Sequence, residues 1–173
     1  MAMRVLVFCM WFLPVIGFAQ KKSKGYFSIT SSLHFTSKAD PGFGGLASGN
    51  LQVTKEFFAG VQLGAIKLPN TDGVYVPLQA KFTIAPSFHS NKVSPVMLIE
   101  PGYGIHSKTY KYYYGSYTEE GGFTFFAGAG VLLPVSTRGG LLLAVGYSSF
   151  GFTMANEKSN LEMIGVRLGV YLK

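Results

Sequence analysis

The sequence predicts an all-β fold: an eight-stranded antiparallel up-and-down β-barrel that crosses a membrane. Apolar residues alternate with small or polar ones over long stretches, the period-two pattern of strands with two different faces. The chain is 48% hydrophobic but only 13% charged, whereas soluble domains carry about a quarter charged residues. Beyond the N-terminal segment no run of about 20 apolar residues occurs, so we expect strands rather than helices in the membrane.

The clearest hairpin is expected over residues 123–152. Its first arm alternates, from Phe123 to Leu133, between a large apolar face and a mostly small face with almost no charge. After a Gly-containing turn at 136–140 the second arm repeats the arrangement from Leu141 onward. A lack of charge on both faces is unusual for strands in water and indicates strands that lie in lipid.

Six further strands are expected before and after this hairpin. They span residues 25–35, 43–53, 57–68, 74–85, 93–106 and 161–172. Strands of about 10 residues cross a bilayer at barrel tilt, so these lengths suffice. Pro95 and Pro101 predict local bulges, because a closed barrel has no free edge that tolerates a missing N–H. We expect one long loop at 107–121 and a last turn at 154–160.

The N-terminal segment predicts export. Residues 1–19 are expected to be a signal peptide, which leaves residues 20–173 as a single β-barrel domain. Arg4 provides the positive start, an apolar core follows, and small residues precede the predicted cleavage after Ala19. Cys9, the only cysteine, lies in this segment, so the mature chain is expected to have no disulfide.

The formal net charge of +7 is spread mainly over chain ends and loops. Basic chains invite a nucleic-acid interpretation, but an exported chain is not expected to meet nucleic acid. Anionic lipid headgroups or glycolipid phosphates are better candidates as partners. Ordinary solubility of the loops is the interpretation we favour.

Alternation alone does not separate a membrane barrel from a soluble lipocalin-like barrel that binds an apolar ligand. The composition of the polar face favours the membrane. A face in water should be rich in Lys, Glu and Asp, whereas here it holds Gly, Ser, Thr, Gln and Asn. Small hydrogen-bonding side chains suit the narrow lumen of an eight-stranded barrel, which side chains fill, so a pore is not expected. The soluble barrel remains the alternative.

Successive side chains of a strand point to opposite faces, so odd and even positions (their parity) separate the two faces. By parity, three charged residues fall on the polar face: Lys81, Glu100 and Arg167. A turn centred between Ser90 and Asn91 places Lys81 directly opposite Glu100. A Lys or Arg facing lipid near the bilayer midplane costs about 2–4 kcal/mol, and a cluster in the lumen avoids this cost. The cluster is either a salt-bridge plug or gate, or a structural ion cluster in a filled barrel, which we favour.

The eight alternating strands and the signal ending at residues 17–20, Gly-Phe-Ala-Gln, resemble small outer-membrane barrels with the OmpA-type transmembrane domain, particularly single-domain forms from Bacteroidota. The resemblance implies periplasmic termini, tight periplasmic turns and outward loops. It also implies outer-membrane lipid and lipopolysaccharide as surroundings and the barrel-assembly machinery as partner during insertion. That machinery reads a final aromatic residue in the family. Here Leu172 and Lys173 end the chain, which departs from the pattern.

The long loop is the best candidate for a surface function. Its candidate binding residues are Lys108, Tyr110, Lys111, Tyr112, Tyr113, Tyr114 and Tyr117. Tyrosine offers a large rigid contact area with a polar tip, which suits a surface protein or a glycan. The alternative, which we favour, is that these tyrosines extend the strands and form the aromatic girdle at the membrane surface.

Catalysis is a weaker hypothesis. Some small barrels modify glycolipid acyl chains with His, Ser and an acid near the outer rim, as a glycolipid acyl hydrolase or transferase does. Residues of these types expected near the rim are Ser32, His34, His106, Ser107, Glu119 and Glu120. A nucleophile needs a base within hydrogen-bond reach and an orienting partner, which the sequence does not show. We therefore expect no enzyme, and scattered histidines predict no metal or cofactor.

Overall fold

The computed structural model describes residues 25–36, 39–69, 73–88, 92–112, 115–154 and 157–173. Within these ranges the regular structure is entirely β. The strands are β1 (Gly25–Thr36), β2 (Ala39–Gln52), β3 (Phe57–Lys67), β4 (Val76–Ile84), β5 (Ser94–Ile105), β6 (Ser107–Tyr112), β7 (Gly115–Ser136), β8 (Gly139–Met154) and β9 (Glu157–Leu172).

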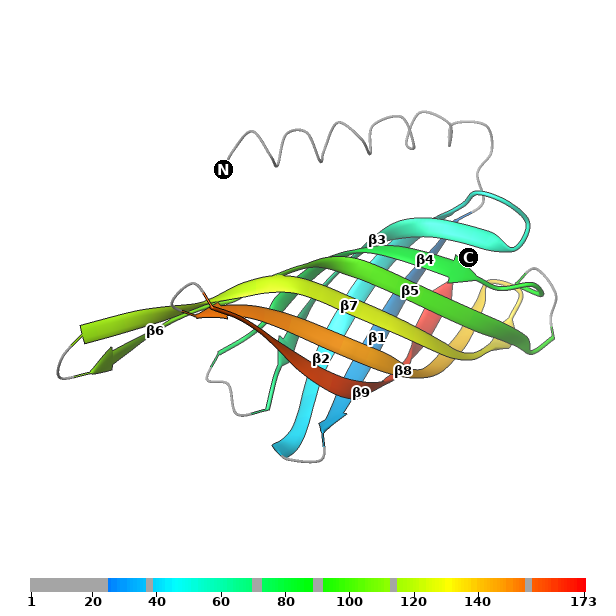
Figure 1. The fold of residues 1–173 in the computed structure, drawn as a ribbon. Helices are drawn as coiled ribbons and strands as arrows, with labels where there is room; N and C mark the ends of the chain where they lie inside the picture. The colour runs from blue at the N-terminus through cyan, green and yellow to red at the C-terminus, as the bar shows by residue number, and fades with distance from the viewer. Residues whose placement is uncertain (1–24, 37–38, 70–72, 89–91, 113–114, 155–156) are drawn as a thin grey trace.

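The strands form one antiparallel sheet that closes on itself (Figure 1). Their order is β5-β4-β3-β2-β1-β9-β8-β7-β6, and β5 also pairs with β7, which closes an eight-stranded barrel. Strand β6 continues β5 beyond His106 and pairs with β7 outside the closed part. The predicted fold class, an eight-stranded up-and-down barrel, is confirmed.

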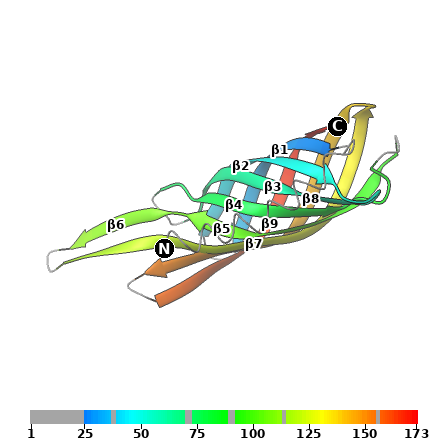
Figure 2. The same ribbon diagram turned by 90° about the horizontal axis from the view of Figure 1, so that it is seen from above.

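The two ends of the barrel differ. At the terminal end lie the start of β1, the end of β9 and the short β2–β3 and β7–β8 turns, with Phe27 paired to Leu172. At the opposite end, which we call the hairpin end, β6 and the first part of β7 project well beyond the closed barrel (Figures 1 and 2). The ends of β8 and β9 also extend in this direction.

The predicted loop at 107–121 is wrong, because this segment forms β6 and the start of β7. Its Tyr and Thr residues favour strand, and β6 and β7 pair without a break from Ser107↔Glu120 to Tyr112↔Gly115. The last turn is also shorter than the predicted 154–160. Ladder pairing continues to Met154↔Glu157, so β8 and β9 are longer than expected.

The bulges expected at Pro95 and Pro101 are absent. Strands β5 and β7 keep one register from Ser94↔Leu132 to Tyr103↔Phe123. Pairing of β4 with β5 is interrupted beside Pro101 and then resumes in the same register. A missing N–H therefore removes ladder bonds here without inserting a residue. The register shifts lie elsewhere, between His34/Thr36, Gly121/Thr124 and Pro134/Ser136.

The barrel has apolar side chains on its outer face, and its polar strand side chains point inside. Every barrel strand carries large outward apolar side chains that are 39–75% exposed, among them Phe27, Leu51, Val61, Leu78, Met97, Phe123, Val145 and Leu168. Inward polar side chains at most 4% exposed include Ser28, Thr30, Gln62, Gln79, Thr83, Thr124 and Ser148. A soluble barrel buries its apolar face, so this polarity is that of a barrel in lipid.

Inside the barrel a polar layer lies between two apolar clusters. The terminal-side cluster contains Tyr26, Phe58, Ala85, Phe88, Val96, Leu98, Phe126, Leu132, Leu142, Ala144 and Tyr171. The rim-side cluster, toward the hairpin end, contains Leu46, Ile66, Leu68, Tyr75, Phe150, Phe152 and Met163. The central polar layer between them holds the charged residues of the lumen.

Candidate functional site

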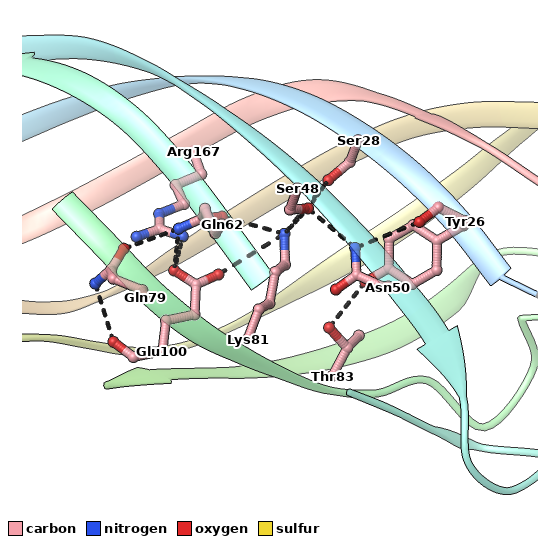
Figure 3. Close-up of polar contacts among 10 residues, drawn as sticks. All are labelled: Tyr26, Ser28, Ser48, Asn50, Gln62, Gln79, Lys81, Thr83, Glu100 and Arg167. Atoms are coloured by element: carbon pink, nitrogen blue, oxygen red, sulfur yellow. Dashed lines mark hydrogen bonds and ion pairs between the residues drawn. The ribbon is translucent and has the colours of Figure 1, made fainter. Parts of the chain in front are cut away.

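The central polar layer is organised around the carboxylate of Glu100 on β5 (Figure 3). Arg167 on β9 places Nη1 against Glu100 Oε2, and Lys81 on β4 places Nζ 3.8 Å from Glu100 Oε1. All three side chains are at most 2% exposed. The structure therefore brings together the three charged residues that parity assigned to the lumen.

Two glutamines add hydrogen bonds to Glu100, at Oε2 and at the backbone carbonyl, whereas Oε1 has no hydrogen bond among the described residues. Gln62 Nε2 donates to Glu100 Oε2 and to Gln79 Oε1, both at 2.9 Å. Gln79 Nε2 in turn donates to the Glu100 backbone carbonyl at 3.0 Å. Such partners matter because a buried charge is tolerated only when its hydrogen-bonding capacity is met. Sequence reasoning placed both glutamines on the polar face but did not assign them to this network.

Lys81 is held chiefly by neutral oxygens. Its ammonium donates to Ser48 Oγ at 3.1 Å and, at 3.4 Å each, to Ser28 Oγ and Gln62 Oε1. The two serine hydroxyls are 2.7 Å apart and bridge β1 to β2. Asn50 Nδ2 donates to Ser48 Oγ at 3.0 Å, so the hydroxyls are themselves fixed (Figure 3).

The guanidinium of Arg167 also stacks on an aromatic ring. Its Cζ lies 3.7 Å from the ring centroid of Phe126, a cation–π contact. Phe126 belongs to the terminal-side cluster, so Arg167 joins that cluster to the ion pair. The contacts of Arg167 and Glu100 therefore cross the lumen and connect β9 and β7 with β4 and β5.

The structure corrects the expected rim position of Ser32 and His34. Both point into the lumen, 1% and 0% exposed, beneath the rim-side cluster. The ring of His34 packs edge-on against Phe150 with centroids 5.0 Å apart. Neither Ser32 Oγ nor either ring nitrogen of His34 has a hydrogen-bond partner among the described residues, so they do not form a nucleophile–base pair.

His106 does lie at the hairpin end. Its Nδ1 is 3.4 Å from the Val74 carbonyl oxygen, and its Nε2 is 3.8 Å from Glu119 Oε2. The backbone of Ser107 pairs with that of Glu120 in the ladder, but the side chain of Ser107 lies outside the described part of the structure. The described side chains therefore provide an imidazole and a carboxylate here, without a nucleophile.

The Tyr-rich segment is a β-hairpin. Its register pairs Tyr110 with Tyr117 and Lys108 with Glu119. Tyr113 and Tyr114 lie outside the described residues. The strand backbone of the segment agrees with the alternative in which the tyrosines extend the strands, and the hairpin reaches beyond the barrel (Figure 2). Lys111 and Tyr112 belong to β6, opposite Ser116 and Gly115.

Within the described ranges, no three His, Cys, Asp or Glu side chains gather as the ligands of a metal ion would. In the same ranges no helix is long and apolar enough to cross a membrane.

A closed eight-stranded antiparallel barrel with an apolar outer belt and polar side chains buried inside is a transmembrane β-barrel by architecture. No protein-family model matches the chain, and no curated protein does. Among solved structures it is similar to Neisserial surface protein A (NspA), with 16% identity and a TM-score of 0.65 over 88% of this chain and 99% of that one. At this identity the similarity supports the fold alone.

A second solved structure, the translocator domain of the autotransporter NalP from Neisseria meningitidis, matches at 11% identity over 99% of this chain and 96% of that one. Its TM-score is 0.27, too low to support an argument.

Proposed function

We propose that this protein is an outer-membrane barrel with a structural and surface-contact role, and that the projecting β6–β7 hairpin is its contact surface. The observation that carries the proposal is a plugged barrel whose β6–β7 hairpin projects well beyond the closed wall (Figure 1). The predicted signal peptide at 1–19 supports export. The OmpA-type, Bacteroidota-like resemblance supports the same compartment, with both termini in the periplasm.

The hairpin has features suited to binding. In the part of the chain that the structure describes, β6 stands at the end of the strand order and its ladder is with β7, so β6 is an edge strand. Such an edge accepts an added strand, and tyrosines at Tyr110, Tyr112 and Tyr117 supply rigid contact area for a protein or a glycan. Lys108 and Lys111 favour an anionic partner.

The apolar belt would contact outer-membrane lipid and lipopolysaccharide, and insertion would use the barrel-assembly machinery. In this proposal Lys81, Glu100 and Arg167 form a structural plug rather than a catalytic or transport site. They connect five barrel strands, β2, β3, β4, β5 and β9, through buried hydrogen bonds and ion pairs.

Topology is tested by tagging both ends of the barrel. One variant carries an epitope between residues 113 and 114, in the sequence between β6 and β7, and its matched control carries the epitope between Lys55 and Glu56 in the β2–β3 turn. We expect antibody to label the hairpin variant on intact cells and the control only after permeabilisation. Labelling of the control on intact cells would reverse the orientation, and recovery of untagged protein in the soluble fraction would exclude the membrane.

Binding is tested with a truncated hairpin. Residues 109–118 are replaced by Asn-Gly, a two-residue turn that connects the paired residues Lys108 and Glu119. The purified variant and the unaltered protein are compared on glycan arrays and with surface-exposed protein extracts. Binding that the truncation abolishes supports the contact role; identical binding by both proteins contradicts it.

A second candidate, a glycolipid acyl hydrolase or transferase, has only the pair His106–Glu119 in its favour. If His34→Ala and His106→Ala leave the glycolipid profile of the membrane unchanged, this candidate is excluded.

A further inference from the structure

The outer wall of the barrel has a groove at the point where β1 ends. The ladder of β1 with β9 ends at the pair Phe35↔Ile164, whereas β9 continues to Glu157 in its ladder with β8. A groove of about 490 Å³, which we call the β1–β9 groove, lies at this step. The residues that line it include Phe35, Thr36, Val145, Tyr147, Glu162 and Ile164. The outward apolar side chains among them are 44–60% exposed.

The groove lies across the boundary between the apolar and the polar part of the outer face. On β9 the outward side chains are apolar from the terminal end as far as Ile164, and the next outward side chain is Glu162. On β8 Tyr147 pairs with Ile164, and the next outward residue, Ser149, pairs with Glu162. An aromatic residue followed by polar ones is typical of the interface between hydrocarbon and headgroups. One end of the groove therefore faces acyl chains and the other end faces headgroups.

The polar end of the groove is negatively charged. Among the described residues that line it, Glu162 is the only charged one. No cationic side chain of the described residues forms an ion pair with Glu162. The hydroxyl of Tyr147 lies within hydrogen-bonding reach of this carboxylate and helps to hold it at the groove. A ligand that fits both ends therefore has an apolar chain and a cationic group in its head.

A primary ammonium is the headgroup cation that suits Glu162 best. It donates charge-assisted hydrogen bonds to a carboxylate, whereas a trimethylated ammonium has no N–H to donate. The phosphate of a zwitterionic lipid needs donors as well. The hydroxyl of Thr36 in the groove and the amide of Asn160, the next outward residue on β9, supply donors without a second charge. A purely anionic headgroup would be repelled by Glu162.

We propose that the β1–β9 groove binds one molecule of phosphatidylethanolamine, with an acyl chain against Phe35 and Ile164 and the ammonium on Glu162. The bound lipid covers the step at which β1 no longer pairs with β9. The inference requires a barrel in a membrane. It depends neither on the contact role of the β6–β7 hairpin nor on the side of the membrane that the hairpin faces.

The test measures which lipid lies against the groove. Trp11, the only tryptophan of the chain, lies in the predicted signal peptide, so a tryptophan introduced into the barrel is a single fluorescent reporter. Phe35→Trp places this reporter in the groove. Phe27→Trp is the matched control, because both phenylalanines point outward from β1 and are 44% exposed. Each variant is purified from membranes and reconstituted in phosphatidylcholine vesicles that contain a small mole fraction of a lipid with brominated acyl chains, which quench tryptophan.

Brominated phosphatidylethanolamine is expected to quench Phe35→Trp more strongly than brominated phosphatidylcholine or phosphatidylglycerol at the same mole fraction. With Phe27→Trp the three lipids should quench alike. Adding Glu162→Gln to Phe35→Trp should abolish the excess quenching, because the amide keeps the shape of the side chain and removes its charge. Glu157→Gln removes an exposed carboxylate of β9 that does not line the groove, so it should leave the excess unchanged.

Each of the other outcomes would overturn the proposal. Equal quenching of Phe35→Trp by the three lipids would mean that the groove contacts only bulk lipid. Stronger quenching by phosphatidylglycerol would assign the groove to an anionic lipid, and no quenching by any lipid would mean that a protein, such as a second copy, covers it. An excess that survives Glu162→Gln would place the selection of the headgroup elsewhere. If Phe35→Trp does not fold, Ile164→Trp, which is 60% exposed and also lines the groove, serves as the reporter.

Discussion

Lys81 lies opposite Glu100 across β4 and β5, yet its ammonium is 3.8 Å from the carboxylate and only 3.1 Å from the hydroxyl of Ser48. Arg167, from the opposite side of the barrel, makes the close contact with Glu100 instead. The Lys81–Glu100 pair, which the strand register predicts, is therefore weaker than the Arg167–Glu100 pair. Lys81 is bound mainly by neutral oxygens, whereas Glu100 depends on Arg167.

This asymmetry predicts unequal effects of removing each charge. Arg167→Met leaves Glu100 with only the distant Lys81 as a charged partner, and breaking a buried pair in this way costs about 3–5 kcal/mol of unfolding free energy. Lys81→Met leaves the Arg167–Glu100 pair intact and removes the surplus cation, so its cost is expected to be clearly smaller. Unfolding in urea, followed by circular dichroism of the protein in lipid vesicles, measures both variants.

Glu100→Gln extends the same comparison. It leaves two buried cations without a carboxylate, so it is expected to be at least as destabilising as Arg167→Met. Equal costs for Lys81→Met and Arg167→Met would contradict the assignment of Arg167 as the main partner.

Much of this layer follows from alternation in the sequence. Parity alone places Lys81, Glu100 and Arg167 inside, and the turn near Ser90 sets the register that the ladder shows at Gln79↔Gly102. Parity does not reveal side-chain direction within the lumen. The choice of Arg167 over Lys81 as partner of Glu100 depends on how β9 lies opposite β5 after closure, which is a long-range relationship.

The errors have a related cause. The sequence of residues 107–121 is polar and Tyr-rich, so it reads as a loop, but pairing of β6 with β7 stabilises it as strand. The position of His34 near the end of its own strand predicts a place at the rim. It is buried because the walls formed by β8 and β9 continue past it and carry Phe150 and Met163 over it.

Gly104 is predicted to be required at the hairpin end. A Cβ added there would collide with the ring of Tyr75, which is 1% exposed and packs edge-on against Phe150. Overpacking of this kind typically costs about 1–3 kcal/mol, so Gly104→Ala should lower the unfolding free energy by that amount. The control is Gly49→Ala, where a Cβ meets no atom within 4 Å. Two variants of equal stability would show that the Tyr75 ring moves aside freely.

The apolar belt predicts a depth-dependent cost of charge. Val61 lies midway along β3 and is 57% exposed on the outward face. In lipid, Val61→Lys should cost about 2–4 kcal/mol, whereas on a barrel in water an exposed substitution changes stability by about 0.5 kcal/mol or less. Val135→Lys is the control, because Val135 is 75% exposed but lies next to the β7–β8 turn, near the interface. The measurement is urea unfolding from lipid vesicles. A negligible cost at Val61 would place the belt outside the membrane.

The hairpin is predicted to be dispensable for the barrel itself. Closure is made by β5 with β7, from Ser94↔Leu132 to Tyr103↔Phe123, and none of these pairs involves residues 109–118. Replacing that segment by Asn-Gly keeps the contact of His106 with Glu119 at the base of the hairpin. The truncated protein should therefore keep the heat-dependent shift in gel mobility of a folded barrel, with an unfolding free energy within about 0.5 kcal/mol of the unaltered protein. A large loss of stability would mean that β6 supports the barrel wall. That structural role would then explain the sequence of the hairpin without a binding partner. Unchanged stability would show that the tyrosines have no structural role in the barrel. A binding role would then explain why the hairpin carries them.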